Sequence, residues 1–159
     1  MEQLWETDAI VPLNMELISP DKVRAEINRF WLILSGKSKS EDKLEDLYSA
    51  DAIVFTGKAR RPEPAMLAIA RRTRRAPGSE SMAEVGTVEL QLAGDVAVAS
   101  YTYKYLRAKT GGDGVKSQRN TLYGRATQIF QMDNKGALKI VHEHLSAAAA
   151  PDESTTRVR

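Results

Sequence analysis

The second half of this chain consists of long strand-like segments separated only by short turns. Hydropathy alternates along residues 84–92, and residues 96–107 are rich in β-branched and aromatic side chains. Residues 119–132 and 137–146 continue the pattern, with glycine-containing turns between the segments. Because short turns join antiparallel neighbours, the pattern predicts an antiparallel meander. It argues against the alternating strand–helix order of a doubly wound nucleotide-binding fold.

Helical patterns are confined to the first half of the chain. Ser19-Pro20-Asp21 is typical of a helix start, with serine at the N-cap and proline at the first helical position. Apolar residues then recur at three- and four-residue steps as far as Gly36: Val23, Ile27, Phe30, Trp31 and Leu34. A short helix over 41–48, a strand over 52–55 and a third helix from 65 to about 75 are predicted to follow. Helices before strands predict an α+β fold, with the helices on one face of a curved sheet.

Composition excludes several kinds of chemistry. The 159 residues fit one domain. They include no cysteine and two histidines, and the chain has a net charge of +2. The chain therefore has no disulfide, no thiolate nucleophile and no cysteine-based zinc or iron–sulfur site. The small net charge gives no general attraction to nucleic acid. We expect a soluble, cytoplasmic protein, because no apolar run approaches the roughly 20 residues of a membrane span and the start lacks a secretory pattern.

Two parts of the sequence resemble one protein superfamily. Residues 94–99, Gly-Asp-Val-Ala-Val-Ala, resemble the hairpin entry common in the nuclear transport factor 2-like superfamily, which includes SnoaL-like polyketide cyclases and ketosteroid isomerases. The resemblance is more specific in two later segments, residues 124–130 and 138–146. The second segment reads Leu-Lys-Ile-Val-His-Glu-His-Leu-Ser. Both segments resemble the end of SnoaL-like domains and of the calcium/calmodulin-dependent protein kinase II association domain. The resemblance covers residues 19–148 in element order, and the last two strands match at motif level.

The resemblance implies a cone-shaped, curved antiparallel sheet wrapped around the N-terminal helix and enclosing a pocket. It divides the chain into an N-terminal extension (1–18), a SnoaL-like domain (19–148) and a flexible tail (149–159). It also implies a homodimer formed through the outer face of the sheet. Leu138 and Leu145 depart from the pattern, since the family usually has Trp at the first position and the kinase association domain has Arg at the second. The basic pocket of that domain would be kept only in part, by Arg125 and Lys104.

The two histidines are the first candidate catalytic residues. His142 and His144 lie two apart on the last predicted strand, so they are expected to share the pocket face with Leu138 and Ile140. Histidine titrates near pH 6.5, which suits general acid–base catalysis, and Asp51 is the acid we would consider beside them. The alternative is a structural pair at the sheet end or the dimer face. Two histidines are too few ligands for zinc, so we expect neither a metal nor a cofactor.

Arg125 is the candidate anchor for a ligand. If its strand face, shared with Thr127, lines the cone, the guanidinium needs either a carboxylate partner or an anionic ligand. An internal salt bridge is the alternative role. The candidate ligand-binding residues are Arg125, Tyr48, Thr127, Lys104 and Trp31.

Two other clusters have ordinary structural interpretations. Tyr101, Tyr103 and Tyr105 share one strand face, which favours packing over an oxyanion hole. Six arginines between residues 60 and 75 form a basic patch without interleaved aromatic residues. We interpret this patch as a solvated helix face and expect no nucleic-acid partner.

Three functions remain open from the sequence. The leading hypothesis is a homodimeric small-molecule-binding protein whose cone holds an anionic, partly apolar ligand. The second is an isomerase, cyclase or hydratase that uses His or Asp acid–base chemistry without a metal. The third is an oligomerisation module with a vestigial pocket. The fold alone does not choose among them, because it hosts all three.

Overall fold

The computed structural model describes residues 18–39, 41–57, 60–73, 79–109, 111 and 118–150. Its helical segments come before most of the sheet: α1 (Pro20–Leu34), a single 3₁₀ turn η1 (Leu44–Leu47) and α2 (Ala65–Arg72). The apolar residues that predict α1 are all buried, which confirms the periodicity. Only Ser19 behaves differently from its motif, because it occupies the N-cap without a side-chain capping hydrogen bond.

The strands are β1 (Tyr48–Thr56), β2 (Glu63–Pro64), β3 (Ser79–Val85), β4 (Glu89–Ala93), β5 (Val96–Lys109), β6 (Gln118–Met132) and β7 (Leu138–Ala147). They form one seven-stranded sheet in the order β2-β1-β7-β6-β5-β3, and β4 also pairs with β5. The pairing of β1 with β7 is parallel and every other pairing is antiparallel. The sheet is therefore mixed, and the expectation of a purely antiparallel sheet needs this correction.

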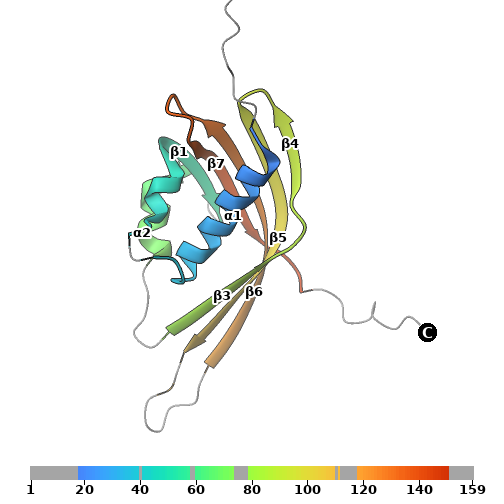
Figure 1. Ribbon diagram of the computed structural model, residues 1–159. Helices are drawn as coiled ribbons and strands as arrows, with labels where there is room; N and C mark the ends of the chain where they lie inside the picture. The colour runs from blue at the N-terminus through green and yellow to red at the C-terminus, as the bar shows by residue number, and fades with distance from the viewer. Residues whose placement is uncertain are drawn as a thin grey trace, which may run out of the picture.

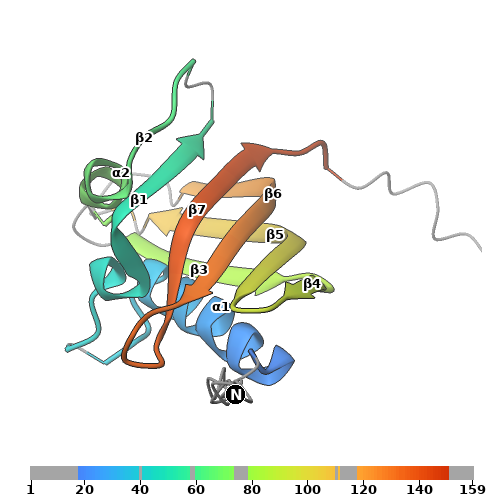
Figure 2. The ribbon, with the colours of Figure 1, turned by 90° about the horizontal axis from the view of Figure 1, so that it is seen from above.

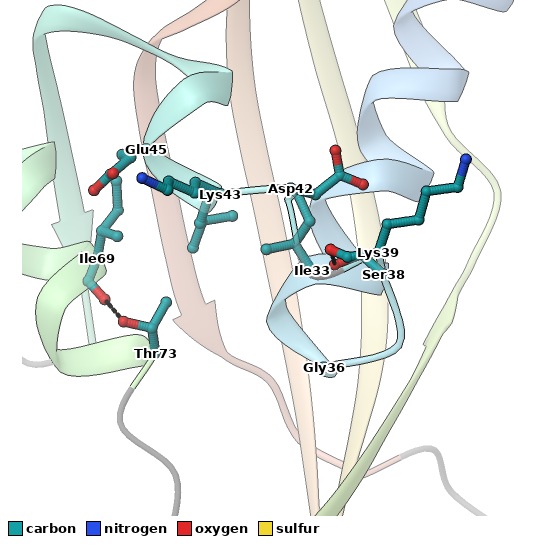
Figure 3. A pocket seen from close by; sticks show the side chains of 10 residues that line it. Ile33, Gly36, Ser38, Lys39, Asp42, Lys43, Glu45, Ile69 and Thr73 are labelled. Atoms are coloured by element: carbon teal, nitrogen blue, oxygen red, sulfur yellow. Dashed lines mark hydrogen bonds between the residues drawn. The ribbon is translucent and has the colours of Figure 1, made fainter.

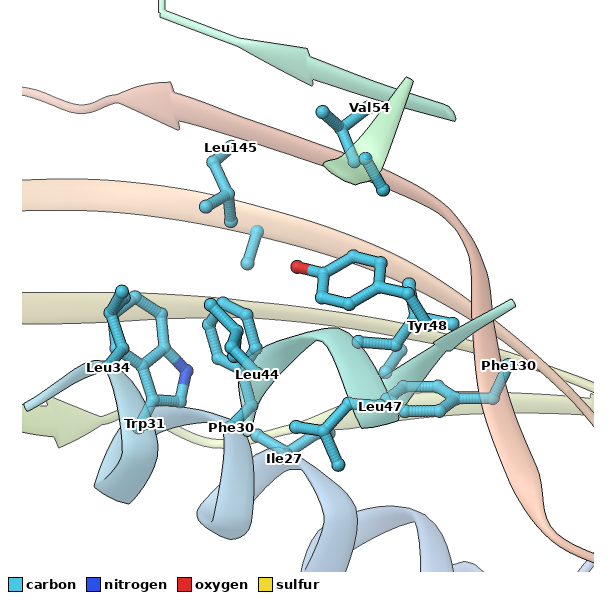
Figure 4. Packing of buried hydrophobic residues seen from close by; sticks show 14 of the residues in the cluster. Ile27, Phe30, Trp31, Leu34, Leu44, Leu47, Tyr48, Val54, Phe130 and Leu145 are labelled. Carbon is cyan, nitrogen blue, oxygen red and sulfur yellow. The ribbon is translucent and has the colours of Figure 1, made fainter. Parts of the chain in front are cut away.

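The sheet curves around the helices and encloses the core. Both α1 and α2 lie against the concave face (Figure 1), and the view from above shows the strands bending around α1 (Figure 2). Phe30 and Ile27 of α1, Leu47 of η1 and Phe130 of β6 meet inside the curve and are almost fully buried (Figure 4). The result is the expected α+β cone, with its interior closed by α1.

Two predicted elements have different bounds. The helix expected over 41–48 is only the turn η1, and β1 already begins at Tyr48. The strand expected over 84–92 is two strands, β3 and β4, with a break at 86–88. Both strands pair with β5, β4 with its first part and β3 with its second. The N-terminal extension up to residue 17 and most of the predicted tail, 151–159, lie outside the described residues.

A β-bulge in β7 reverses which side chains face the core. Ile140 pairs with Phe130 and His142 pairs with Ile129, so Val141 is one extra residue in β7. Before the bulge, Leu138 and Ile140 are buried; after it, the buried residues are Glu143 and Leu145. The prediction that His142 and His144 share the inner face with Leu138 and Ile140 is therefore wrong, because an inserted residue shifts the two-residue period by one position.

Candidate functional site

A buried carboxylate lies at the centre of the cone. Glu143 has no exposed surface, and both of its oxygens accept hydrogen bonds from buried or nearly buried donors. Tyr48 Oη and Gln128 Nε2 each donate to Glu143 Oε2 at 2.8 Å. Arg72 Nη1 donates to Glu143 Oε1 in an ion pair and also lies 3.1 Å from Tyr48 Oη. Strands β1, β6 and β7 and helix α2 thus all contribute to one cluster of polar groups.

The hydrogen bonds continue from the carboxylate to α1. Tyr101 Oη donates to Gln128 Oε1 at 2.8 Å and accepts from Trp31 Nε1 at 3.0 Å. The indole of Trp31 packs on the Tyr103 ring at 4.4 Å between centroids. Tyr105 Oη donates to the carbonyl of Leu34 at the end of α1. The tyrosine row is therefore a packed face, as predicted, whose hydroxyls also bind polar partners.

The charge pair determines the protonation states around it. Burial and the adjacent negative charge of Glu143 raise the pKa of Tyr48 well above its ordinary value, so this tyrosine stays a neutral donor. Burial alone would lower the pKa of Arg72, but attraction to Glu143 and contact with Tyr48 outweigh it, and the pKa is raised. Burial also raises the pKa of Tyr101.

The charge cluster borders a cavity at the mouth of the cone. The cavity has a volume of about 230 Å³ and lies between the ends of α1 and α2 and the inner face of β3, β5 and β6. Three cations line it, Arg72, Arg107 and Lys109, and its described lining contains no acidic residue. Arg72 is 12% exposed, and its second nitrogen, Nη2, is buried with no hydrogen-bond partner among the described residues. Glu143 therefore engages one nitrogen of this guanidinium and leaves the other without a partner.

Two of the predicted site residues lie in the interior. Tyr48 is buried and its hydroxyl points into the core (Figure 4). Trp31 is buried in α1 and belongs to the same chain of hydrogen bonds. The structure therefore brings these two together with Arg72 and Glu143.

The other predicted site residues lie on the outer face of the sheet or away from the mouth. Arg125 and His144 are exposed and Thr127 is half-buried, on the face opposite the core. His142 pairs with Ile53 and Ile129, and the ring of Phe55 lies 6.0 Å from the ring of His144. These orientations separate the predicted catalytic pair from the cone interior.

Two further candidates have ordinary surface positions. Asp51 is exposed on β1, and Lys104 is paired with Glu84 at 3.8 Å on the outer face of β5. Neither lines the mouth cavity.

The residues that form the interior cluster were only weakly signalled by the sequence. Arg72 belongs to the arginine patch interpreted as solvated helix surface, and the structure corrects this for Arg72, which turns inward. Gln128 shares its strand face with Ala126 and Phe130, which is the one pattern that could have marked it as buried. Glu143 lies between the two histidines in sequence and therefore faces the opposite side of β7, which the bulge makes the inner side.

Comparisons with known proteins support the architecture. No family model and no curated protein matches the chain. Among solved structures, a nuclear transport factor 2-like superfamily protein from Salmonella enterica serovar Typhimurium superposes with a TM-score of 0.62 and 16% identity, over 85% of this chain and 94% of its own. The chain has the nuclear transport factor 2-like fold.

Other structures with this fold are named for different roles. The β subunit of benzoate 1,2-dioxygenase from Burkholderia mallei matches with a TM-score of 0.63 and 18% identity, over 82% of this chain and 91% of its own. A Xanthomonas campestris protein named for the calcium/calmodulin-dependent protein kinase II association domain matches with a TM-score of 0.60 and 17% identity, over 82% of this chain and 88% of its own. At these identities the likeness is one of fold, so the function must be argued from this chain's own residues.

Within the described part of the chain, no group of three or more His, Asp or Glu side chains is arranged to hold a metal ion. None of the described helices is long and apolar enough to cross a membrane.

Proposed function

We propose that this protein binds a small, anionic and partly apolar molecule in the mouth cavity of the cone. The observation that carries the proposal is the charge of the lining: Arg72, Arg107 and Lys109 face a cavity whose described lining has no acidic side chain. Leu34, Tyr105 and Ala108 add apolar surface to the same cavity. Its 230 Å³ lies below the roughly 300–1,000 Å³ typical of pockets for drug-sized ligands, which favours a small ligand.

Arg72 is the expected anchor of the anion. Its Nη1 is held by Glu143, which fixes the guanidinium plane, while Nη2 has no partner among the residues described. If the guanidinium turns toward the cavity, an anionic oxygen at Nη2 would satisfy a buried donor that otherwise stays unpaired. Charge-assisted bonds of this type are stronger than neutral ones. The Arg107 guanidinium lies over the Tyr105 ring at 5.3 Å, so a second cation is oriented beside the same cavity.

The interior contacts favour binding over acid–base catalysis. A general base must reach the proton that it removes, yet Glu143 is fully buried and both of its oxygens already accept hydrogen bonds. The histidines, the other candidate bases, lie on the outer face. The isomerase or cyclase alternative therefore requires a rearrangement that simple ligand binding does not.

A matched pair of probes tests the proposal. Binding of 2-naphthoate and of uncharged 2-naphthamide is measured by calorimetric titration. The ring fits the apolar wall in both, and the carboxylate is present in only one, so we expect naphthoate to bind at least about tenfold more tightly and to weaken as salt is added. The double substitution R107Q/K109Q should reduce naphthoate affinity while leaving the interior cluster intact.

Arg125→Gln is the matched control, because it removes a cation from the opposite face of the sheet. Its naphthoate affinity should equal that of the unmodified protein. Equal affinity for the two probes would contradict the proposal, as would loss of binding in R125Q with retention in R107Q/K109Q. The second outcome would restore Arg125 as the anchor.

We also propose that the protein is a homodimer that pairs through the outer face of its sheet. The support is an apolar surface around the histidines: His142 lies between Ile53 and Ile129, and His144 between Phe55 and Thr127. Ile53 is 43% exposed on this face. Exposed apolar side chains grouped on one sheet face are typical of protein interfaces.

A further inference from the structure

Strand β3 lies at one edge of the described sheet. Strand β3 pairs with β5 on one side, and among the described residues no strand pairs with its other side. Gly86 N donates to Thr102 O at 2.8 Å, which fixes the alternation of this antiparallel pair. Because backbone groups alternate between facing the partner and facing away, the free edge carries the N–H and C=O groups of Ser81, Ala83 and Val85.

A groove adjoins the first half of β3. It has a volume of about 610 Å³ and is lined by 79–82 of β3, by 35–37 after α1, and by 106–108 of β5 with Arg119 of β6. Its walls include side chains from both faces of the sheet, Ser81 from the inner face and Met82 from the outer. Such a lining suits an extended peptide, which pairs with an edge strand through its backbone and sends alternate side chains to the two faces.

The groove is basic, with an apolar patch and a buried hydroxyl. Lys37, Arg107 and Arg119 line it against a single acid, Glu80. Ser35 is 5% exposed, and its Oγ has no hydrogen-bond partner in the described structure. On the outer wall Met82, 45% exposed, is paired in register with Leu106. The matching ligand is therefore an acidic, partly apolar extended peptide.

The cavity beside it is less suited to a ligand of one charge. It has a volume of about 410 Å³ and lies between the loop after α1 and α2 (Figure 3). Its two lysines, Lys39 and Lys43, are balanced by Asp42 and Glu45, and Asp42 already pairs with Arg29 at 3.1 Å. Of these two, only the edge groove has a lining charge that selects a partner.

We propose that residues 1–17 of this chain bind the groove beside β3. Their sequence has the required chemistry: four acidic side chains, Glu2, Glu6, Asp8 and Glu16, no Lys or Arg, and apolar residues between them. Their length is sufficient to reach the groove within one chain. Helix α1, with 15 residues, is about 22 Å long, whereas 17 extended residues span up to about 56 Å.

Amide hydrogen exchange in the full-length protein, resolved by NMR, tests this. The edge amides of Ser81, which lines the groove, and of Ala83, the next along the same edge, should exchange slowly in the unmodified protein. Neutralising the segment (E2Q/E6Q/D8N/E16Q) or the groove (K37Q/R119Q) should each accelerate them about tenfold or more. Combining the two sets should add little, because both remove the same contact. The β5-facing amides of the same strand, such as Glu84, report any global loss of stability.

Arg61→Gln is the matched control, an exposed cation outside the groove, and it should leave the edge amides unchanged. Lys37 and Arg119 do not line the mouth cavity, so the result is independent of the anion site. Edge amides that exchange equally in all variants would overturn the proposal, and so would fully additive effects. Protection that rises with protein concentration would also overturn it, in favour of a neighbouring copy as the source of the peptide.

Discussion

Arg72 at the end of α2 and Glu143 in β7 form a buried ion pair across 71 positions of sequence. The pair holds α2 against the sheet and connects the mouth cavity to the interior hydrogen bonds. Burying two charges carries a desolvation cost, which their attraction and the bonds from Tyr48 and Gln128 offset. The pair stabilises the fold only when both members are present, because loss of one leaves the other charged in the core.

Removal of the carboxylate should destabilise the fold strongly. Glu143→Leu leaves the Arg72 guanidinium buried without its counter-charge, and we expect a loss of about 3–5 kcal/mol in the free energy of unfolding, measured by urea denaturation. The double variant E143L/R72L should recover much of this loss, since no unpaired charge remains. Glu63→Gln, which breaks the exposed pair with Arg71, should move the midpoint little. A small loss of unfolding free energy in E143L that the double variant does not restore would contradict the ion-pair account.

Alkaline pH should destabilise the protein through Tyr48. Its pKa in the fold is raised well above 10.0, so above that pH the unfolded chain loses this proton while the folded chain keeps it. The folded state then binds more protons, and stability falls with rising pH by about 1.4 kcal/mol per unit for one such group. The stabilising contribution of Tyr48 is fully present below about pH 10 and is lost as the pH rises above it.

Urea midpoints measured between neutral and strongly alkaline pH check this slope. Tyr48→Phe should flatten the decline, although it lowers stability at neutral pH by removing the hydrogen bond to Glu143. Tyr123→Phe, on the outer face of β6, is the matched control. An unchanged slope in Y48F would show that other groups dominate the alkaline transition.

Gly124 is required because Tyr103 occupies the space beside it. A Cβ at residue 124 would lie 2.1 Å from Tyr103 Cζ, so Gly124→Ala forces the buried ring to move. We expect a loss of about 1–3 kcal/mol in the free energy of unfolding, as for other overpacked cores. Tyr103→Leu should remove most of this penalty in the double variant, which a double-mutant cycle by urea denaturation measures. Additive losses in that cycle would place the strain elsewhere.

The fold was predictable largely because its periodic signals are long. Helix α1 repeats its apolar positions over 15 residues and β5 alternates over 14, so local pattern and tertiary packing agree in these two elements. The faces of β6 were harder. Arg125 lies on one face with apolar Ile129, whereas polar Gln128 shares the other with Phe130, so hydropathy gives no clear inner side.

The candidate site was not predictable from the sequence, because two features that form it produce no periodic pattern. One is the bulge at Val141, which moves Glu143 inward and His144 outward. The other is the position of Arg72 on the last turn of α2, where one arginine of a basic run turns into the core while Arg71 pairs with Glu63 at the surface. A charge in such a run is ordinarily solvated, and only the buried carboxylate across the interior makes this one different.

The proposed dimer makes the outer face of the sheet the place where a single charge should matter most. Ile53→Arg puts a cation among Phe55, Ile129 and the two histidines, where it would have to be desolvated on association. We expect the unmodified protein to sediment as a dimer at micromolar concentration and I53R as a monomer with an unchanged circular dichroism spectrum. Leu67→Arg is the control, because Leu67 is 59% exposed on α2, away from that face. A monomeric unmodified protein, or a dimer that L67R disrupts and I53R does not, would rule out association through the sheet.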